Sequence, residues 1–337
     1  MSDKVLVTGG AGFIGAHVAR RLLDAGYEVI VLDDLSGGMR ANIPEEAVFI
    51  EGSVLDSALL DEIFHDHGIR YVYHLAAYAA EGLSHFIRVF NYRNNVVGSV
   101  TVINAAVRHK VERLVFTSSI AVYGSNQVPM HEALDPRPED PYGIAKFAVE
   151  MDLAAAHKLF GLRYTIFRPH NVYGEYQNLN DPYRNVIGIF MWQILQGKPL
   201  TIFGDGEQSR AFSYVDDAVQ PMIECLGLPE TAGEVFNVGS DISFTVNQLA
   251  AAVMRSMGAE ARIVRLDARE EVVHAFADHS KIQQYIGGLP DPVTLEDGLG
   301  RMAAWAKKQE LRPPKPFTGI EIEDKLPPSW RQFVSGG

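Results

Sequence analysis

Val5-Leu6-Val7-Thr8-Gly9-Gly10-Ala11-Gly12-Phe13-Ile14-Gly15, residues 5–15, is the stretch that decides the fold of this chain. Three apolar residues typical of a strand run directly into glycines, and Phe13 to Leu23 then has the pattern of an amphipathic helix that ends at Gly26. Glycines let the backbone approach a pyrophosphate, and the first N–H groups and the dipole of the helix favour an anion there. The stretch predicts dinucleotide binding, although the glycine spacing alone also fits an ordinary tight turn.

The next predicted strand ends in a carboxylate that suits a dinucleotide. Glu28–Leu32 reads as a buried strand, and Asp33, which follows it, lies 24 positions after Gly9. An acidic residue near this distance bonds the adenosine ribose hydroxyls and repels a 2′-phosphate, so Asp33 favours NAD over NADP. A turn that begins before Gly37-Gly38 is the alternative explanation of Asp33, and the nearby Arg40 keeps NADP open.

Strands and helices alternate through the first half of the chain. This alternation predicts an α/β fold with a doubly wound, parallel Rossmann sheet, in which ligands bind at the carboxyl ends of the strands. The further predicted strands are 48–50, 71–75, 113–116 and 164–167. Three helices are predicted between them, one that ends near 67 and two that cover 91–109 and 142–160.

The alternation loosens after residue 168, which predicts a second, smaller α+β domain for the substrate. We expect residues 1–170 to form the NAD-binding domain, with 214–240 returning to it, and 171–213 and 241–337 to form the substrate domain. Prolines crowd the last 27 residues, so we expect a tail without regular structure on the surface. Predicted elements here are helices at 186–197, 245–257 and 295–309, a helix ending near 228, and strands at 200–203, 210–214 and 235–238.

Composition and charge exclude several classes of protein. The 337 residues include 42 acidic and 30 basic side chains, a net charge of −12 that argues against a nucleic-acid partner. No apolar run reaches the length of a membrane span, and no secretory leader is expected because the N-terminus leads straight into a strand. The single cysteine, Cys225, lies in an apolar pattern, which predicts a core position and a cytoplasmic protein. His65-Asp66-His67 reads as a polar helix end, so no metal site is expected.

Three residues carry the predicted chemistry. Tyr142 and Lys146 are four apart in a predicted helix and therefore share one face, while Ser119 follows the strand at 113–116 and faces the same crevice as the glycine turn. Hydride transfer from an alcohol to a nicotinamide needs a base for the hydroxyl proton. An adjacent ammonium lowers the pKa of a phenol toward that role. Each residue alone has an ordinary structural explanation, and the three together favour catalysis.

The motifs together resemble the extended short-chain dehydrogenase/reductase family. The sequence is most similar to its nucleotide-sugar epimerases of the UDP-glucose 4-epimerase type, and the resemblance covers about residues 4–300. It rests on the glycine stretch, Asp33-Asp34-Leu35, Asn94-Asn95, Ser118–Gly124, Tyr142–Lys146, Arg168–Gly174, Phe203–Gly206 and Arg210–Asp217.

The resemblance implies roles for individual residues. Ser119, Tyr142 and Lys146 would be the catalytic triad. NAD would be bound by Gly9, Gly12, Phe13, Ile14, Gly15, Asp33, Asp34, Leu35, Ser36, Ser53, Val54, Leu75, Ala76, Ala77, Asn95, Thr117, Tyr142, Lys146 and His170. A UDP-sugar substrate would be bound by Glu81, Ser119, Tyr142, Asn171, Asn185, Val186, Phe203, Arg210 and Arg269. The helices at 91–109 and 142–160 would form a homodimer interface.

One local feature separates the reactions of such relatives. Dehydratases of this group carry Thr-Asp-Glu before the Val-Tyr-Gly motif, and this chain has Ser119-Ile120-Ala121. Because apolar side chains cannot move protons, the sequence disfavours dehydration and predicts epimerisation through transient oxidation at C4. A reductase or another epimerase, including enzymes for UDP-glucuronate or UDP-N-acetylhexosamines, stays open, and so does an NAD-binding sensor without catalysis.

Overall fold

The computed structural model describes residues 2–125, 128–183, 185–268, 274–310, 313, 317–328 and 330–331. Its centre is a seven-stranded, wholly parallel sheet in the order β11-β6-β5-β4-β1-β2-β3. The strands that form the middle of this sheet are buried and almost continuously apolar, as a sheet covered on both faces requires. The strands are β1 (Lys4–Thr8), β2 (Glu28–Asp33), β3 (Val48–Glu51), β4 (Tyr71–His74), β5 (Arg113–Thr117), β6 (Tyr164–Pro169) and β11 (Val235–Val238).

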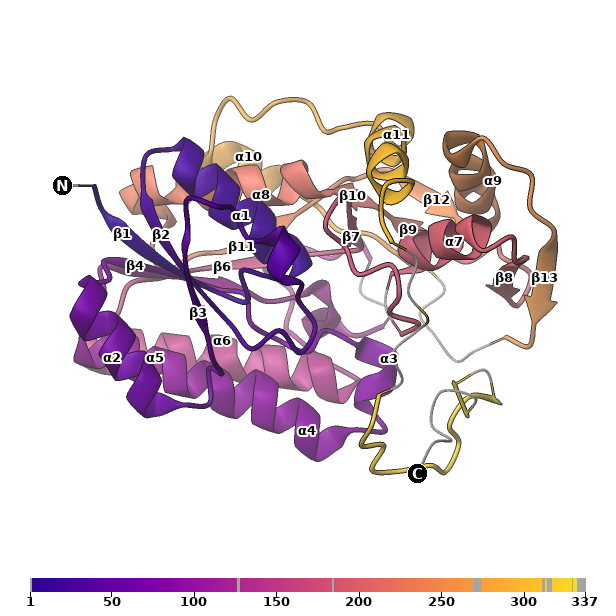
Figure 1. Ribbon diagram of the computed structural model, residues 1–337. Helices are drawn as coiled ribbons and strands as arrows, with labels where there is room; N and C mark the ends of the chain where they lie inside the picture. The colour runs from indigo at the N-terminus through magenta and orange to yellow at the C-terminus, as the bar shows by residue number, and fades with distance from the viewer. Residues whose placement is uncertain are drawn as a thin grey trace.

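Helices cover both faces of the sheet, which confirms the predicted doubly wound α/β class (Figure 1). One face carries α1 (Phe13–Asp24), α8 (Val215–Glu224) and α10 (Ser280–Tyr285); the other carries α2 (Ser57–His67), α5 (Gly98–Arg108) and α6 (Pro141–Phe160). Each face has its own apolar core, with Val18 and Met222 on the first and Phe64 and Leu153 on the second. Among the described residues, no helix has both the length and the apolar character needed to cross a membrane.

The helix predicted at 91–109 begins earlier and is not a regular α-helix. It runs from α4 (Arg88–Tyr92) through a π-helical turn at Arg93–Val97 into α5. Such a turn holds one extra residue and often lies at a functional site. Here it places two adjacent asparagines, Asn94 and Asn95, beside the carboxyl end of β4.

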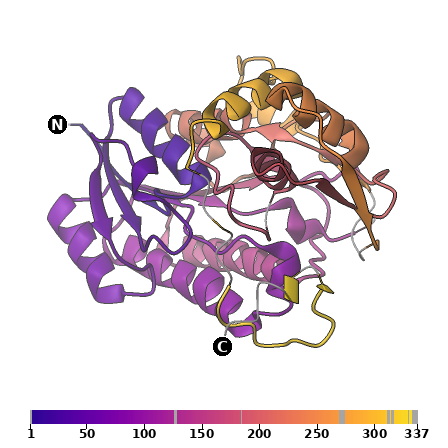
Figure 2. The same ribbon diagram turned by 45° about the vertical axis from the view of Figure 1, so that its right-hand side comes forward.

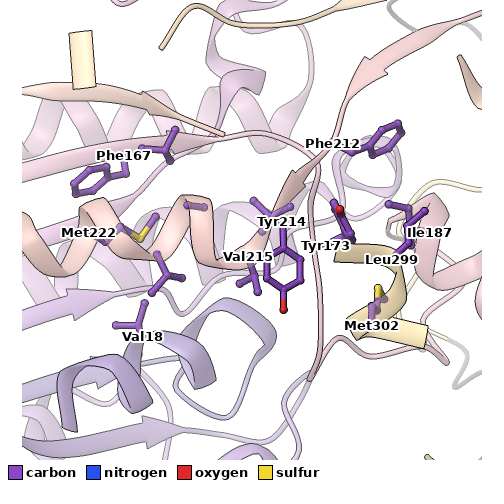
Figure 3. Close-up of a cluster of buried hydrophobic side chains, with 14 of the residues drawn as sticks. Val18, Phe167, Tyr173, Ile187, Phe212, Tyr214, Val215, Met222, Leu299 and Met302 are labelled. Carbon is purple, nitrogen blue, oxygen red and sulfur yellow. The ribbon is translucent and has the colours of Figure 1, made fainter. Parts of the chain in front are cut away.

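The rest of the chain forms small sheets and helices beyond the carboxyl ends of the large sheet. The stretch predicted as one strand at 210–214 is two strands in different sheets, separated at Phe212. Figure 3 shows the core shared by both parts, with Val18 and Met222 on one side of Tyr214 and with Tyr173 and Leu299 on the other. The strand groups are β7 (Val172–Tyr173) with β10 (Ser213–Tyr214), β8 (Leu200–Phe203) with β13 (Ile263–Leu266), and β9 (Ser209–Ala211) with β12 (Ser243–Thr245) and β14 (His274–Ala275). The helices are α7 (Val186–Leu195), α9 (Val246–Met257) and α11 (Leu295–Ala306), and 3₁₀ turns cover Arg40–Asn42, Ile120–Tyr123, Cys225–Gly227 and Pro229–Thr231.

The proline-rich tail does more than lie on the surface. Its described part, within 317–331, returns along the underside of the molecule to α3 (Glu81–Ser84) and α4 (Figure 2). Leu326 and Trp330 are buried there, against Leu83 and Ile87. The tail is therefore part of the packed structure near the carboxyl ends of the strands.

Candidate functional site

A single long cleft runs across the carboxyl ends of the parallel strands and collects most of the predicted site residues. The predicted cofactor residues that line it are Gly9, Gly12, Phe13, Ile14, Gly15, Asp33, Asp34, Ser36, Ser53, Val54, Leu75, Ala76, Ala77, Thr117, Tyr142 and Lys146. Those predicted for the substrate that line it are Glu81, Ser119, Tyr142, Asn171, Asn185 and Val186.

The glycine turn lies at one end of the cleft and leaves no room for side chains. Gly9 has φ +73°, and a Cβ there would lie 2.6 Å from the Ala76 nitrogen. A Cβ on Gly15 would lie 2.1 Å from the Gly9 carbonyl oxygen. Gly12 begins α1 without a side-chain cap, so the first N–H groups of the helix remain directed at the turn. Close backbone approach and free helix N–H groups together suit a pyrophosphate.

Asp33 ends β2 beside this turn. Its carboxylate accepts hydrogen bonds from the backbone nitrogens of Ala11, at 3.0 Å, and Leu35, at 2.8 Å. Burial raises the pKa of Asp33, and these two hydrogen bonds oppose the rise. Arg40 lies outside the cleft lining, with its guanidinium 4.9 Å over the Phe49 ring and 3.9 Å from Glu51. The acidic residue therefore lies at the cleft and the basic one points elsewhere.

Ser119, Tyr142 and Lys146 lie in the middle of the same cleft. Ser119 caps the short helix 120–123, with its Oγ accepting from the Ala121 nitrogen at 3.1 Å. Asp140 caps α6, so Tyr142 occupies the first turn of that helix and Lys146 the second. The Lys146 Nζ donates to the Thr117 carbonyl at 2.7 Å and lies 5.7 Å from the centre of the Tyr142 ring. Burial lowers the pKa of Lys146 to about 7, and the charge of Glu150 opposes this.

An ion pair beneath these residues was not predicted. Arg168 at the end of β6 donates through Nε and Nη2 to both carboxylate oxygens of Glu150, at 2.9 and 2.5 Å. Ser118 donates to the same carboxylate at 2.5 Å, and Arg168 also donates to the Tyr123 hydroxyl. Glu150 stands one turn after Lys146 on the buried stripe of α6, and that charge among apolar residues is the signal that sequence reasoning missed.

The structure separates the two neighbouring asparagines. Asn94 lines the cleft, whereas Asn95, which was expected at the cofactor, is buried behind it. The Asn95 amide accepts from the Tyr78 nitrogen at 2.8 Å and donates to the Tyr78 oxygen at 3.1 Å. Asn95 therefore holds the loop after β4 and does not line the cleft, contrary to the expectation that it would bind the cofactor.

His170, another predicted cofactor residue, turns away from the cleft. Its ring stacks on His279, with the two Nε2 atoms 3.1 Å apart, and its Nδ1 lies 3.3 Å from the Ala211 oxygen. Burial and, second to it, the charge of His279 lower the pKa of His170 to about 3. The residue before it, Pro169, lines the cleft instead.

Three more predicted residues that the structure describes, Leu35, Phe203 and Arg210, do not line the cleft. Leu35 contributes its backbone N–H to Asp33. Phe203 ends β8 and Arg210 lies in β9, so both are in the small sheets beyond the cleft. Arg269 lies outside the described residues. Among the residues that the structure does describe, no cluster of histidine, cysteine and acidic side chains could hold a metal ion.

The loop after β7 also lines the cleft, and nothing in the sequence indicated it. Tyr176, Gln177 and Asn178 extend from the second part of the chain over the glycine turn. Asn42 joins this loop to the glycine turn, because its side-chain amide donates to the backbone oxygens of both Ala11 and Tyr176, each at 3.1 Å. The Gln177 Oε1 is buried and has no hydrogen-bond partner among the described residues. Such an acceptor suits a donor group on a bound ligand.

Comparisons with known proteins agree with this geometry. The model of the NAD dependent epimerase/dehydratase family matches residues 5–239. A putative UDP-glucose 4-epimerase of Methanocaldococcus jannaschii is 33% identical, over 90% of this chain and 98% of that protein. A UDP-glucose 4-epimerase of Thermotoga maritima, solved with UDP-glucose, is 36% identical with a TM-score of 0.85, over 90% of this chain and 99% of that one. A UDP-glucuronic acid 4-epimerase of Bacillus cereus, solved with UDP-glucuronic acid and NAD, is 30% identical with a TM-score of 0.82 and the same coverage.

The cofactor is NAD, as predicted from the glycine stretch and Asp33. The residues of the cleft fit NAD. Gly9 and Gly15 leave a space in the glycine turn, a cradle that any Cβ would fill, and Asp33 lies beside this space. Gln177 adds a buried hydrogen-bond acceptor. When bound, NAD supplies a nicotinamide that can accept a hydride and return it.

Gly15→Ala tests the cradle. The added Cβ would lie 2.1 Å from the Gly9 oxygen and 2.8 Å from the Gly10 Cα, and because both are backbone atoms the turn itself must shift. We expect the Kd for NAD, measured by calorimetry, to rise at least about tenfold. Gly300→Ala is the matched control, since nothing lies within 4 Å of its Cβ. Unchanged NAD affinity in the Gly15 variant would show that the pyrophosphate binds elsewhere.

Proposed function

The chain belongs to the NAD dependent epimerase/dehydratase family, and on that premise we propose that it interconverts UDP-glucose and UDP-galactose. It is an NAD-dependent nucleotide-sugar epimerase, and the choice of sugar is the proposal. The observation that carries the epimerase activity is the arrangement of Ser119, Tyr142 and Lys146 in one cleft with the glycine turn, and the similarity to UDP-glucose 4-epimerases supports the choice of sugar.

We propose a division of labour among the three residues. Tyr142 as phenolate takes the proton from the C4 hydroxyl and later returns it to the same oxygen. The Lys146 ammonium, 5.7 Å from the Tyr142 ring, favours the phenolate. Ser119 donates a hydrogen bond to the reacting oxygen. Between the two proton transfers the 4-keto sugar turns its other face, which inverts C4.

The residues after Ser119 support epimerisation over dehydration. Ile120 and Ala121 are apolar and form the start of a 3₁₀ turn, so neither can move a proton at C5. Among the described residues of the cleft, the acidic side chains are Asp33 and Asp34 at the cradle and Glu81 on α3. Elimination of water uses a pair of acidic side chains beside the sugar, and Glu81 alone does not supply such a pair.

The domain division is also a proposal. We propose that residues 1–170 with 214–240 bind NAD and that 171–213 with 241–337 bind the UDP-sugar. Two contacts support the return of 214–240: β11 pairs with β6 in the large sheet, and α8 packs on α1. We place the protein in the cytoplasm because Cys225, its only cysteine, is buried and needs no oxidising compartment.

A panel of nucleotide sugars tests the function. The protein is incubated separately with UDP-glucose, UDP-galactose, their N-acetyl forms and UDP-glucuronate, and proton NMR identifies the C4 epimer that appears. We expect equilibration of UDP-glucose and UDP-galactose without net change in NADH, because the enzyme returns its own hydride. Turnover of the N-acetyl forms or the glucuronate alone would replace the proposed substrate. Sustained net production of NADH would indicate a dehydrogenase, and sustained net consumption of NADH would indicate a reductase.

Tyr142→Phe tests the mechanism. Removing the phenol removes the proton acceptor, so kcat should fall at least about a hundredfold while NAD remains bound. Tyr27→Phe, which alters a tyrosine in the turn between α1 and β2, is the control and should keep full activity. Near-normal turnover by the Tyr142 variant would contradict the assigned base.

We propose a homodimer formed by the α4–α5 helix and α6, which pack side by side (Figure 1). Apolar side chains on these helices are unusually exposed, among them Val89 at 72%, Val97 at 52% and Met151 at 54%. A second copy would cover them. Combining Val97→Asp with Met151→Asp should give a monomer in sedimentation velocity, whereas Ile242→Asp, which also alters an exposed apolar residue, should not. A monomeric wild-type protein would remove the proposal.

A further inference from the structure

The chain that follows α11 is anchored to the loop region 78–90. The backbone nitrogen of Glu321 donates to the Phe86 oxygen at 2.8 Å, and its carboxylate accepts from the nitrogens of Val89 and Phe90 at 2.8 Å each. A carboxylate that accepts from the first N–H groups of a helix, here α4, is a stabilising contact. Both figures of the whole molecule show this segment beside α3 and α4 (Figures 1 and 2).

The inner side of this segment is aromatic and contacts residues that line the cleft. Phe317 packs on the rings of Tyr78 and Phe90, at centroid distances of 5.3 and 5.0 Å. Trp330 packs edge-on against Tyr183 at 5.4 Å. Tyr78, Phe90 and Tyr183 all line the cleft.

Trp330 also lies close under α3. A Cβ on Gly82 would come within 3.3 Å of its ring, so the helix backbone and the indole are already in contact. Trp330 is only 6% exposed, which means that the cleft wall at Gly82 and Tyr183 is backed by a fully packed side chain. The indole therefore supports both of these lining residues at this point.

This wall lies next to the catalytic tyrosine. The glycine turn and Asp33 mark the NAD site, and Tyr142 lines the same cleft. Ser84 on α3 accepts from the Tyr142 nitrogen at 3.2 Å, so α3 is bonded directly to the residue that we propose acts on the sugar. Glu81 and Gly82, the first two residues of α3, line the cleft there.

We propose that the described part of residues 317–331 forms the outer wall of the sugar subsite, with Trp330 as the positioning residue that sets its size. This inference rests on the proposed nucleotide-sugar function. Trp330 acts through Gly82 and Tyr183 and does not itself touch the substrate. The wall confines the sugar and excludes bulkier ones.

Binding of two ligands tests the wall without depending on turnover. Calorimetry with the NAD-loaded protein measures the Kd for UDP-glucose and the Kd for UDP, which has no sugar. For Trp330→Ala we expect the Kd for UDP-glucose to rise at least about fivefold and the Kd for UDP to stay within about twofold. Trp330→Phe keeps a ring at the position and should restore most of the affinity.

Steady-state kinetics add a second readout. Because Ser84 joins α3 to Tyr142 independently of Trp330, we expect KM to rise while kcat stays within about threefold. The ratio of kcat/KM for UDP-N-acetylglucosamine to that for UDP-glucose should also rise, since the subsite is larger.

Controls separate the wall from general destabilisation. Ile322→Ala changes a 43% exposed residue of the same segment and should bind UDP-glucose like the wild type. Glu321→Ala detaches the segment at α4 without making a core cavity, so it tests the wall if Trp330→Ala does not fold. Equal Kd values for UDP-glucose in the wild type and in the folded variants would overturn the wall. A wild type that binds UDP-glucose but converts no nucleotide sugar would overturn the proposed function alone.

Discussion

The buried ion pair between Glu150 and Arg168 is the interaction on which the catalytic region depends. Both side chains are almost wholly removed from water, which is costly for two charges unless every polar atom finds a partner. Here Arg168 donates hydrogen bonds to both carboxylate oxygens of Glu150 and to the Tyr123 hydroxyl, and Ser118 donates another to Glu150. The pair thus joins the ends of β5 and β6 to α6. Ser119 follows β5, Asn171 follows β6, and Tyr142 and Lys146 lie on α6.

The pair also sets the electrostatics of the lysine. Lys146 is buried, and burial alone would favour its neutral form. Glu150, one helical turn along, favours the ammonium. Replacing Glu150 would therefore leave Arg168 as an unpaired buried charge and remove the anion that opposes the fall in the pKa of Lys146. A residue outside the cleft lining in this way influences the charge next to the phenol.

The parts of the site that depend on local pattern could be predicted from the sequence. The glycine turn, the strand ending at Asp33 and the start of α6 follow from short-range rules, and the structure brings Gly9, Asp33, Ser119, Tyr142 and Lys146 to one cleft. The alternation of strands and helices predicts that the large sheet is parallel and doubly wound, as the structure shows.

Features that depend on long-range packing could not be predicted. The orientation of His170 is decided by His279, more than a hundred residues later, and the place of Tyr176 over the glycine turn is decided by Asn42. The small strands β12 and β13 are short and partly exposed, so they lack a distinctive pattern. The contact of Trp330 with Gly82 joins segments that are far apart in the sequence, and no local rule predicts it.

The π-helical turn at 93–97 has a consequence for how this helix can change. In an α-helix each residue advances the side-chain direction by about 100°. Before the turn, Asn91 faces α6 and bonds the Pro141 oxygen; after it, Ser99 faces the sheet and bonds His74. Deleting one residue between them would restore regular helical geometry and rotate one of these contacts out of phase with the other. The extra residue sets the rotation between the side chains before the turn and those after it. The helix therefore tolerates substitutions more readily than a change of length.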